Sequence, residues 1–65
     1  MNKKVKIKTR NFLHIGTEDK KKKAWLVESF KMHSGNRINS VYMRRNDFAY
    51  HCDWLIKKLK GEYVL

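Results

Sequence analysis

The sequence predicts an α+β fold, in which a small antiparallel sheet of about three strands, with a short fourth strand as an option, packs against one C-terminal amphipathic helix. Three observations predict it. Apolar and basic residues alternate near the N-terminus, turn-forming residues at 33–36 separate two apolar segments, and apolar residues recur at helical spacing after Asn46. A chain of 65 residues has room for one modest core, so we expect residues 1–65 to form a single basic domain.

The first expected strand begins near the N-terminus, where Val5, Ile7 and Thr9 alternate with basic residues. A period of two places apolar and basic side chains on opposite faces of a strand. Phe12, Leu13 and Ile15 extend the apolar signal to Gly16, where a turn could begin. Residues 18–23 contain no apolar side chain, and we expect them to form an exposed loop.

Two further strands are expected on either side of a turn. Residues 24–32 are rich in apolar and aromatic side chains and form the second main strand, and residues 37–44 return as its hairpin partner. Gly35 and Asn36 favour the turn between them because both residues tolerate positive φ.

The helix is the clearest element. Asn46 or Asp47 is a suitable N-cap, and the apolar stripe is formed by Phe48, Cys52, Leu55 and Leu59. We expect a helix of about 13 residues that ends near Gly61. Residues 62–65 form a short edge strand or trail from the domain.

Charge is the main indication of function. The 16 Lys and Arg residues oppose six Asp and Glu residues, which leaves a formal net charge of +10. A polyanion complements such a surface, although lysines also keep small proteins soluble. We expect a non-catalytic nucleic-acid-binding protein, for DNA or RNA, that acts by neutralising phosphates. The candidate contacts are Lys4, Lys6, Lys8, Arg10, Lys20, Lys21, Lys22, Lys23, Arg37, Arg44, Arg45, Lys57 and Lys58.

Two groups of these lysines fit a second role as well. Lys4, Lys6, Lys8 and Arg10 would lie on one strand face at a spacing of about 6.6–6.8 Å, close to that of successive phosphates. The same lysines could instead protect a free sheet edge from pairing. Lys20–Lys23 could wrap onto phosphates or form an ordinary solvated loop.

Aromatic residues offer a second kind of contact. On the helix, Tyr50 and Trp54 lie away from the apolar stripe, where they could stack on unpaired bases, contact a protein partner or lie buried beneath a loop. Trp25 and Phe30 belong to the core or to a stacking sheet face, and the core is favoured.

Catalysis and metal binding are not expected. His14, His33 and His51 are scattered, and no Cys-x-x-Cys or spaced His pair indicates a zinc site. Cys52 lies on the apolar stripe, which favours a packing role over a nucleophilic one. We therefore expect no enzyme activity, no metal and no cofactor.

The alternative function is that of a small regulator or inhibitor, similar to a viral (phage) accessory protein, that binds an acidic host protein through Tyr50, Trp54 and the cationic surface. A second copy of the chain is a further candidate partner, whereas a membrane is a weak one because the apolar stripe is needed for the core. The lone Cys52 and the absence of a long apolar segment indicate a cytoplasmic location, in the host cytoplasm if the chain comes from a phage.

The order of elements loosely resembles the small basic archaeal chromatin proteins, which have an SH3-like barrel. The resemblance rests on Val5-Lys6-Ile7-Lys8, on Lys22-Lys23-Ala24-Trp25 and on the C-terminal helix. Cys52 and the aromatic-rich hairpin have no evident counterpart there. The resemblance implies a related fold and says little about function.

Overall fold

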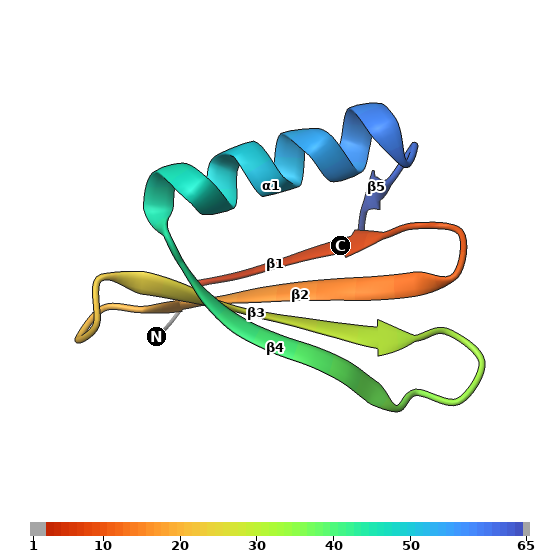
Figure 1. Cartoon of the computed structure of the whole chain (residues 1–65), viewed down its shortest axis with the longest axis horizontal. Coiled ribbons are helices and arrows are strands. Elements are labelled where there is room, and N and C mark those ends of the chain that lie inside the picture. The colour runs from red at the N-terminus through yellow and green to blue at the C-terminus, as the bar shows by residue number, and fades with distance from the viewer. Residues whose placement is uncertain (1–2, 65) are drawn as a thin grey trace.

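Four consecutive strands form an antiparallel meander, and a helix and a short fifth strand follow it (Figure 1). The computed structural model describes residues 3–64. The elements are β1 (Lys4–Lys8), β2 (Phe12–Asp19), β3 (Ala24–Lys31), β4 (Arg37–Arg44), α1 (Arg45–Lys58) and β5 (Glu62–Tyr63). The strand order is β4-β3-β2-β1-β5. The α+β class is confirmed, but the described residues form five strands where the sequence predicted three or four.

The additional strand comes from the segment around Gly16, where the predicted turn is wrong. The chain turns earlier, between β1 and β2, where the backbone N–H of Thr9 donates to the carbonyl oxygen of Phe12 at 2.9 Å. Gly16 lies in the middle of β2 and is buried. A Cβ atom at Gly16 would lie 2.5 Å from Cε1 of Phe48, so glycine is needed for packing of the helix and not for a turn.

The expected loop at residues 18–23 is shorter than predicted. Glu18 and Asp19 belong to β2, and only residues 20–23 form the turn to β3. The Asp19 carboxylate accepts the backbone N–H groups of Lys21 and Lys22 at 3.1 and 3.2 Å, which satisfies donors in the turn.

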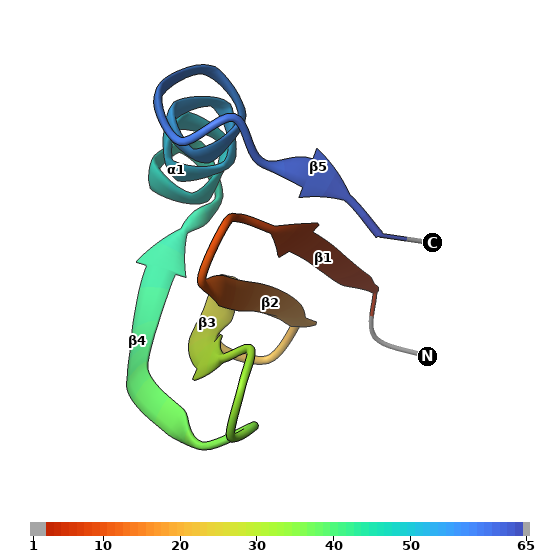
Figure 2. The same cartoon turned by 90° about the vertical axis from the view of Figure 1, so that its right-hand side faces the viewer.

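The sheet curls, and α1 lies across its concave face between β4 and β5 (Figure 2). The buried core consists of Ile7, Val27, Phe48, Cys52 and Leu55. The rings of Trp25 and Phe48 stack with centroids 4.4 Å apart, so Trp25 lies in the core as expected. The other face of the sheet has no second layer among the described residues.

The helix begins directly after β4. Arg44 occupies the N-cap position without a side-chain hydrogen bond, so the prediction of Asn46 or Asp47 as N-cap is wrong. Because β4 runs into α1 without a linker, Asn46 and Asp47 lie within the first turn, where the Asp47 carboxylate suits the positive end of the helix dipole. Leu59 is exposed and does not extend the buried stripe.

The hairpin and the C-terminal strand follow the predictions. The turn between β3 and β4 contains Gly35 at φ +72°, and its N–H donates to the carbonyl oxygen of Lys31 at 2.8 Å. Strand β5 pairs with β1 through Ile7–Tyr63 and Lys8–Glu62, which confirms the short edge strand. Over residues 3–64, no helix has the length and apolar character needed to cross a membrane.

Candidate nucleic-acid interface

The lysines of β1 lie on the sheet face that the helix leaves uncovered. Val5 and Ile7 pack toward α1, and alternation along the strand turns Lys4, Lys6 and Lys8 to the opposite side, where all three are exposed. We call this side the outer face. Cross-strand pairing assigns to it Lys4, Lys6, Lys8, Leu13, Ile15, Thr17, Asp19, Ala24, Leu26, Glu28, Phe30, Arg37, Ser40, Tyr42, Arg44 and Glu62.

Edge protection does not account for the lysines in the second half of β1. This strand pairs with β2 along its whole length and with β5 at Ile7 and Lys8. In addition, the N–H of Val64 donates to the carbonyl oxygen of Lys6 at 2.9 Å. From Lys6 onward, β1 is therefore an interior strand, and its lysines do not guard a free edge.

An apolar band crosses the middle of the outer face. It consists of Leu13 and Ile15 from β2 and of Leu26 and Phe30 from β3. Leu13 lies opposite Phe30. Leu13, Ile15, Leu26 and Phe30 are half-buried, although no described helix or strand covers the band. The band lies next to the β1 lysines, since Lys6 pairs with Ile15 and Lys8 with Leu13.

Strand β4 places an aromatic ring and cations on the other side of the band. Tyr42 lies opposite Leu26 and is 48% exposed. The Nζ atom of Lys22 lies 4.2 Å from the centroid of the Tyr42 ring, a cation–π contact that links the Lys20–Lys23 turn to this face. Arg44 lies opposite Ala24. Arg37 forms an ion pair with Glu28, with Nη1 of Arg37 3.2 Å from Oε2 of Glu28.

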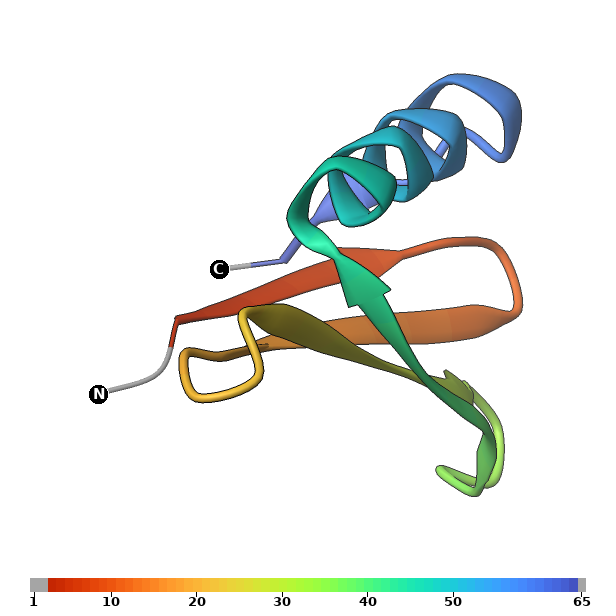
Figure 3. The same cartoon turned by 60° about the vertical axis from the view of Figure 1, so that its left-hand side comes forward.

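A basic hollow of about 500 Å³ adjoins Tyr42 at the N-terminus of α1. Its lining is Lys22, Lys23, Ala24, Tyr42, Met43, Arg44, Arg45 and Asn46, which includes four cations and no carboxylate. Neither ion pair in residues 3–64, Arg37–Glu28 or Lys57–Asp53, involves these four cations. The N–H groups of the uncapped first helical turn add positive potential at this end. Figure 3 shows that the Lys20–Lys23 turn and the start of α1 lie at the same end of the molecule.

Acidic residues are few on the outer face, and two of them already have local partners. Glu28 binds Arg37, and Asp19 accepts backbone N–H groups of the adjacent turn. Glu62 pairs in register with Lys8 at the β5 corner. The β1 lysines and the basic hollow therefore lie on two sides of the apolar band, and the Glu28 carboxylate, which lies within the band opposite Ile15, is paired with Arg37.

Several expected contacts lie elsewhere. Tyr50 and Trp54 are 76% and 50% exposed on α1, which packs on the opposite side of the sheet. Lys57 pairs with Asp53 at 3.3 Å on the same helix, and Lys58 is also there. The prediction that Arg10 shares a strand face with the β1 lysines is wrong, because β1 ends at Lys8 and Arg10 lies in the turn to β2, at the end of the sheet away from the basic hollow. The structure thus separates the predicted residues into an outer-face group and a helix group, with Arg10 outside both.

Sequence reasoning did not identify Tyr42 as a contact and favoured the core for Phe30. A usable signal was present in residues 24–31, where the period of two sets Trp25 and Val27 against Leu26 and Phe30. Strand β2 was not predicted from the sequence, so Leu13 and Ile15 could not be assigned to a face of the sheet.

The comparisons with known proteins add no family. The chain matches no protein-family model, no curated protein sequence and no solved structure.

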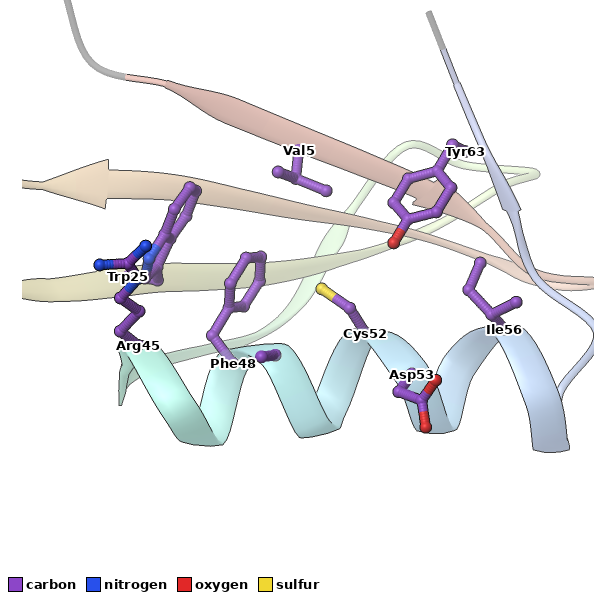
Figure 4. A pocket seen from close by; sticks show the side chains of 9 residues that line it. Val5, Trp25, Arg45, Phe48, Cys52, Asp53, Ile56 and Tyr63 are labelled. Atoms are coloured by element: carbon purple, nitrogen blue, oxygen red, sulfur yellow. The ribbon is translucent and has the colours of Figure 1, made fainter.

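A second cavity, of about 450 Å³, lies between α1 and the β1–β5 edge (Figure 4). Its lining is Val5, Trp25, Arg45, Phe48, Ala49, Cys52, Asp53, Ile56 and Tyr63. Burial raises the pKa of the Cys52 thiol, which is the reverse of what an activated nucleophile requires. The cavity is therefore mainly an apolar gap beside the core.

His14 of β2 and His51 of α1 pack against each other between the sheet and the helix. Nδ1 of His14 and Oγ of Ser29 are 2.9 Å apart, and the His14 and His51 rings meet edge to face with centroids 6.1 Å apart. Burial lowers the pKa of both histidines, which favours the neutral form of each ring. No group of three His, Cys, Asp or Glu residues within residues 3–64 is arranged to hold a metal ion.

Proposed function

We propose that this protein binds single-stranded nucleic acid through its outer face. The observation that supports the proposal most directly is the apolar band, which is uncovered and has the β1 lysines on one side and the basic hollow with Tyr42 on the other.

The β1 lysines supply the first phosphate contacts. Alternate residues of a strand are spaced by about 6.6–6.8 Å, which is comparable to the distance between phosphates along one nucleic-acid strand. Lysine ammonium groups act as point charges on flexible stems, so they follow the backbone without reading bases. The basic hollow supplies a second set of contacts through Lys22 and Arg44.

The apolar band and the two aromatic rings suit base faces better than base edges. Leu13, Ile15 and Leu26 carry no side-chain donors or acceptors with which to read a duplex groove. Phe30 and Tyr42 offer rings on which unpaired bases stack, and such stacking contributes about 1–3 kcal/mol per base. This chemistry favours single strands over duplexes.

The test is a salt titration of binding to single-stranded DNA, single-stranded RNA and duplex DNA. Contacts from Lys4, Lys6, Lys8, Lys22 and Arg44 predict a slope of log affinity against log salt of about −3.5, because each contact to a single strand contributes about −0.7. The triple variant Lys4→Gln, Lys6→Gln, Lys8→Gln retains two of these contacts, and its slope should fall to about −1.4.

The matched control is the triple variant Lys57→Gln, Lys58→Gln, Lys60→Gln. It loses the same charge from the end of α1, and its slope should stay near that of the wild type. If both triple variants change the slope equally, the charge acts non-specifically and the outer face is not the site. Equal affinity for duplex and single strands would exclude base stacking.

A second candidate function is binding to an acidic protein, and the exposure of Tyr50 and Trp54 favours it. Tyrosine and tryptophan are enriched among the residues that dominate binding energy at protein interfaces. These two side chains lie on α1, away from the outer face. Capture of one acidic protein that survives nuclease treatment, and that is lost in the Tyr50→Ala, Trp54→Ala variant, would support this function in place of the first.

A further inference from the structure

Strand β4 is a free sheet edge with exposed apolar side chains. It pairs with β3 on one side, and no described strand pairs with its other side (Figure 2). Every residue of β4 is exposed except Met43, which is half-buried. Ile38 and Tyr42 are each 48% exposed and Val41 is 40% exposed. Exposed main-chain donors and acceptors beside apolar side chains form a surface that can pair with another strand.

The composition of β4 contrasts with the opposite edge of the sheet. Proteins commonly protect edges with Lys, Pro, very short strands or bulges. The β1 side ends in the two-residue strand β5 and carries lysines. By contrast, residues 38–43 contain no charge and no Pro, and the arginines lie only at the two ends of β4. The bulge between Ser29 and Phe30 affects the Arg37 end and leaves residues 39–44 in regular register.

We infer that β4 pairs antiparallel with β4 of a second copy of this chain, about a two-fold axis at Val41. Side chains directly opposite in a sheet lie on the same face. In this register Val41 meets Val41 and Asn39 meets Met43 on the helix side, while Ser40 meets Tyr42 on the outer face. The pairs fall entirely within the regular part of β4.

Self-complementarity argues for a second copy as the partner: in this register residues 38–44 pair only with one another, and no cation among them faces a cation. Two chains of net charge +10 repel each other over most of their surfaces, and the six neutral residues of β4 form a strip along which that repulsion is smallest. An acidic partner would be attracted to the cations and not to this strip. The backbone N–H of Ser40 already donates to Oδ1 of its neighbour Asn39 at 2.9 Å, a local contact that an incoming strand would replace.

The dimer would have one continuous sheet, with two apolar bands and two Tyr42 rings on the same outer surface. This pairing does not depend on nucleic acid, and its salt dependence has the opposite sign to that of nucleic-acid binding. Salt screens the repulsion between two cationic chains and so favours the dimer, whereas it weakens contacts to phosphates.

Sedimentation of the full chain without nucleic acid, at micromolar to millimolar concentration, tests the pairing. The mass should rise from 7.9 kDa toward twice that value with concentration and with salt. Val41→Lys should keep the chain monomeric because it places two charges face to face, whereas Tyr50→Lys adds the same charge on α1 and should leave the dimer intact. A monomer at every concentration and salt level would overturn the inference.

Cross-linking provides a second test that does not depend on a disruptive variant. Opposed residues of antiparallel strands have Cα atoms about 4.5–5.5 Å apart, which is within the range that a disulfide spans. Val41→Cys should form a covalent dimer on mild oxidation, and Tyr50→Cys should not. If Tyr50→Cys cross-links as readily as Val41→Cys, the contact is random collision and the proposed edge pairing is wrong.

Discussion

Replacing Gly16 with Ala should destabilise the protein strongly for a change of one methyl group. The added Cβ would lie 2.5 Å from Cε1 of Phe48, so the ring must move. Phe48 has little room to do so, because it is buried and stacks on Trp25 with ring centroids 4.4 Å apart. Overpacking of this kind costs about 1–3 kcal/mol. At about 2 kcal/mol, the melting temperature of a domain of this size would fall by about 8–16 °C.

The assay is urea unfolding followed by far-UV circular dichroism for the wild type, Gly16→Ala, Phe48→Leu and the double variant. Because Leu is smaller than Phe at the point of contact, the double variant should lose less stability than the sum of the two single variants, by about 1 kcal/mol or more. An unchanged m-value would show that the denatured state is the same in each case.

Additive effects, or a loss below about 0.5 kcal/mol for Gly16→Ala, would refute this reasoning. The contact between Gly16 and Phe48 also matters for the proposed function. The contact between Phe48 and Gly16 holds α1 on the concave side of the sheet, and this is what leaves the outer face uncovered.

Three further outcomes are expected. The pKa values of His14 and His51 are lowered on folding, so the unfolded chain binds more protons near and below about pH 6.5, and the free energy of unfolding should fall as the pH drops below that value. Urea midpoints at pH 7.5 and pH 5 measure this fall. His51→Gln should reduce the difference between the two midpoints, and an unchanged difference would exclude His51 as a source. Cys52 is buried and its thiol pKa is raised, so it should react with a thiol reagent much more slowly in the native protein than in denaturant; equal rates would show that the helix does not cover it. Tyr42→Ala should weaken binding to single-stranded DNA by about 5–150-fold, because one lost stacking contact costs about 1–3 kcal/mol. Trp54→Ala should change this affinity little. The reverse result would assign binding to the helix.

Local patterns predicted those elements that short-range physics determines. Alternation of Val5 and Ile7 with lysines predicted β1, Gly35 and Asn36 predicted the turn after β3, and the helical spacing of Phe48, Cys52 and Leu55 predicted α1. In each case the pattern of one segment carries enough information, because a strand or helix must turn its apolar side to the core.

The errors arose where a distant contact decides the structure. Gly16 looks like a turn residue, yet it serves the packing of Phe48, which lies more than thirty residues later in the chain. Because β2 was not predicted to continue through Gly16, Leu13 and Ile15 could not be assigned to either face of the sheet. The apolar band could therefore not be predicted. The helix cap was wrong for a related reason, since β4 continues directly into α1 and leaves no loop residue for the cap.

The candidate site was predicted in part. The alternation in β1 correctly placed Lys4, Lys6 and Lys8 on one face, and the expectation that Tyr50 and Trp54 lie away from the buried stripe agrees with their exposure. The sequence could not indicate that these aromatic residues and the β1 lysines lie on opposite layers, because that separation depends on which sheet face the helix covers.

The most direct test of the proposed function is a nuclear magnetic resonance titration of the isotope-labelled protein with a short single-stranded oligonucleotide. Signals from Lys4–Lys8, Phe30, Tyr42 and Arg44 should shift in a saturable way, while those of Tyr50 and Trp54 stay in place. Shifts concentrated at Tyr50 and Trp54, with the outer face unchanged, would contradict the assignment of the binding surface.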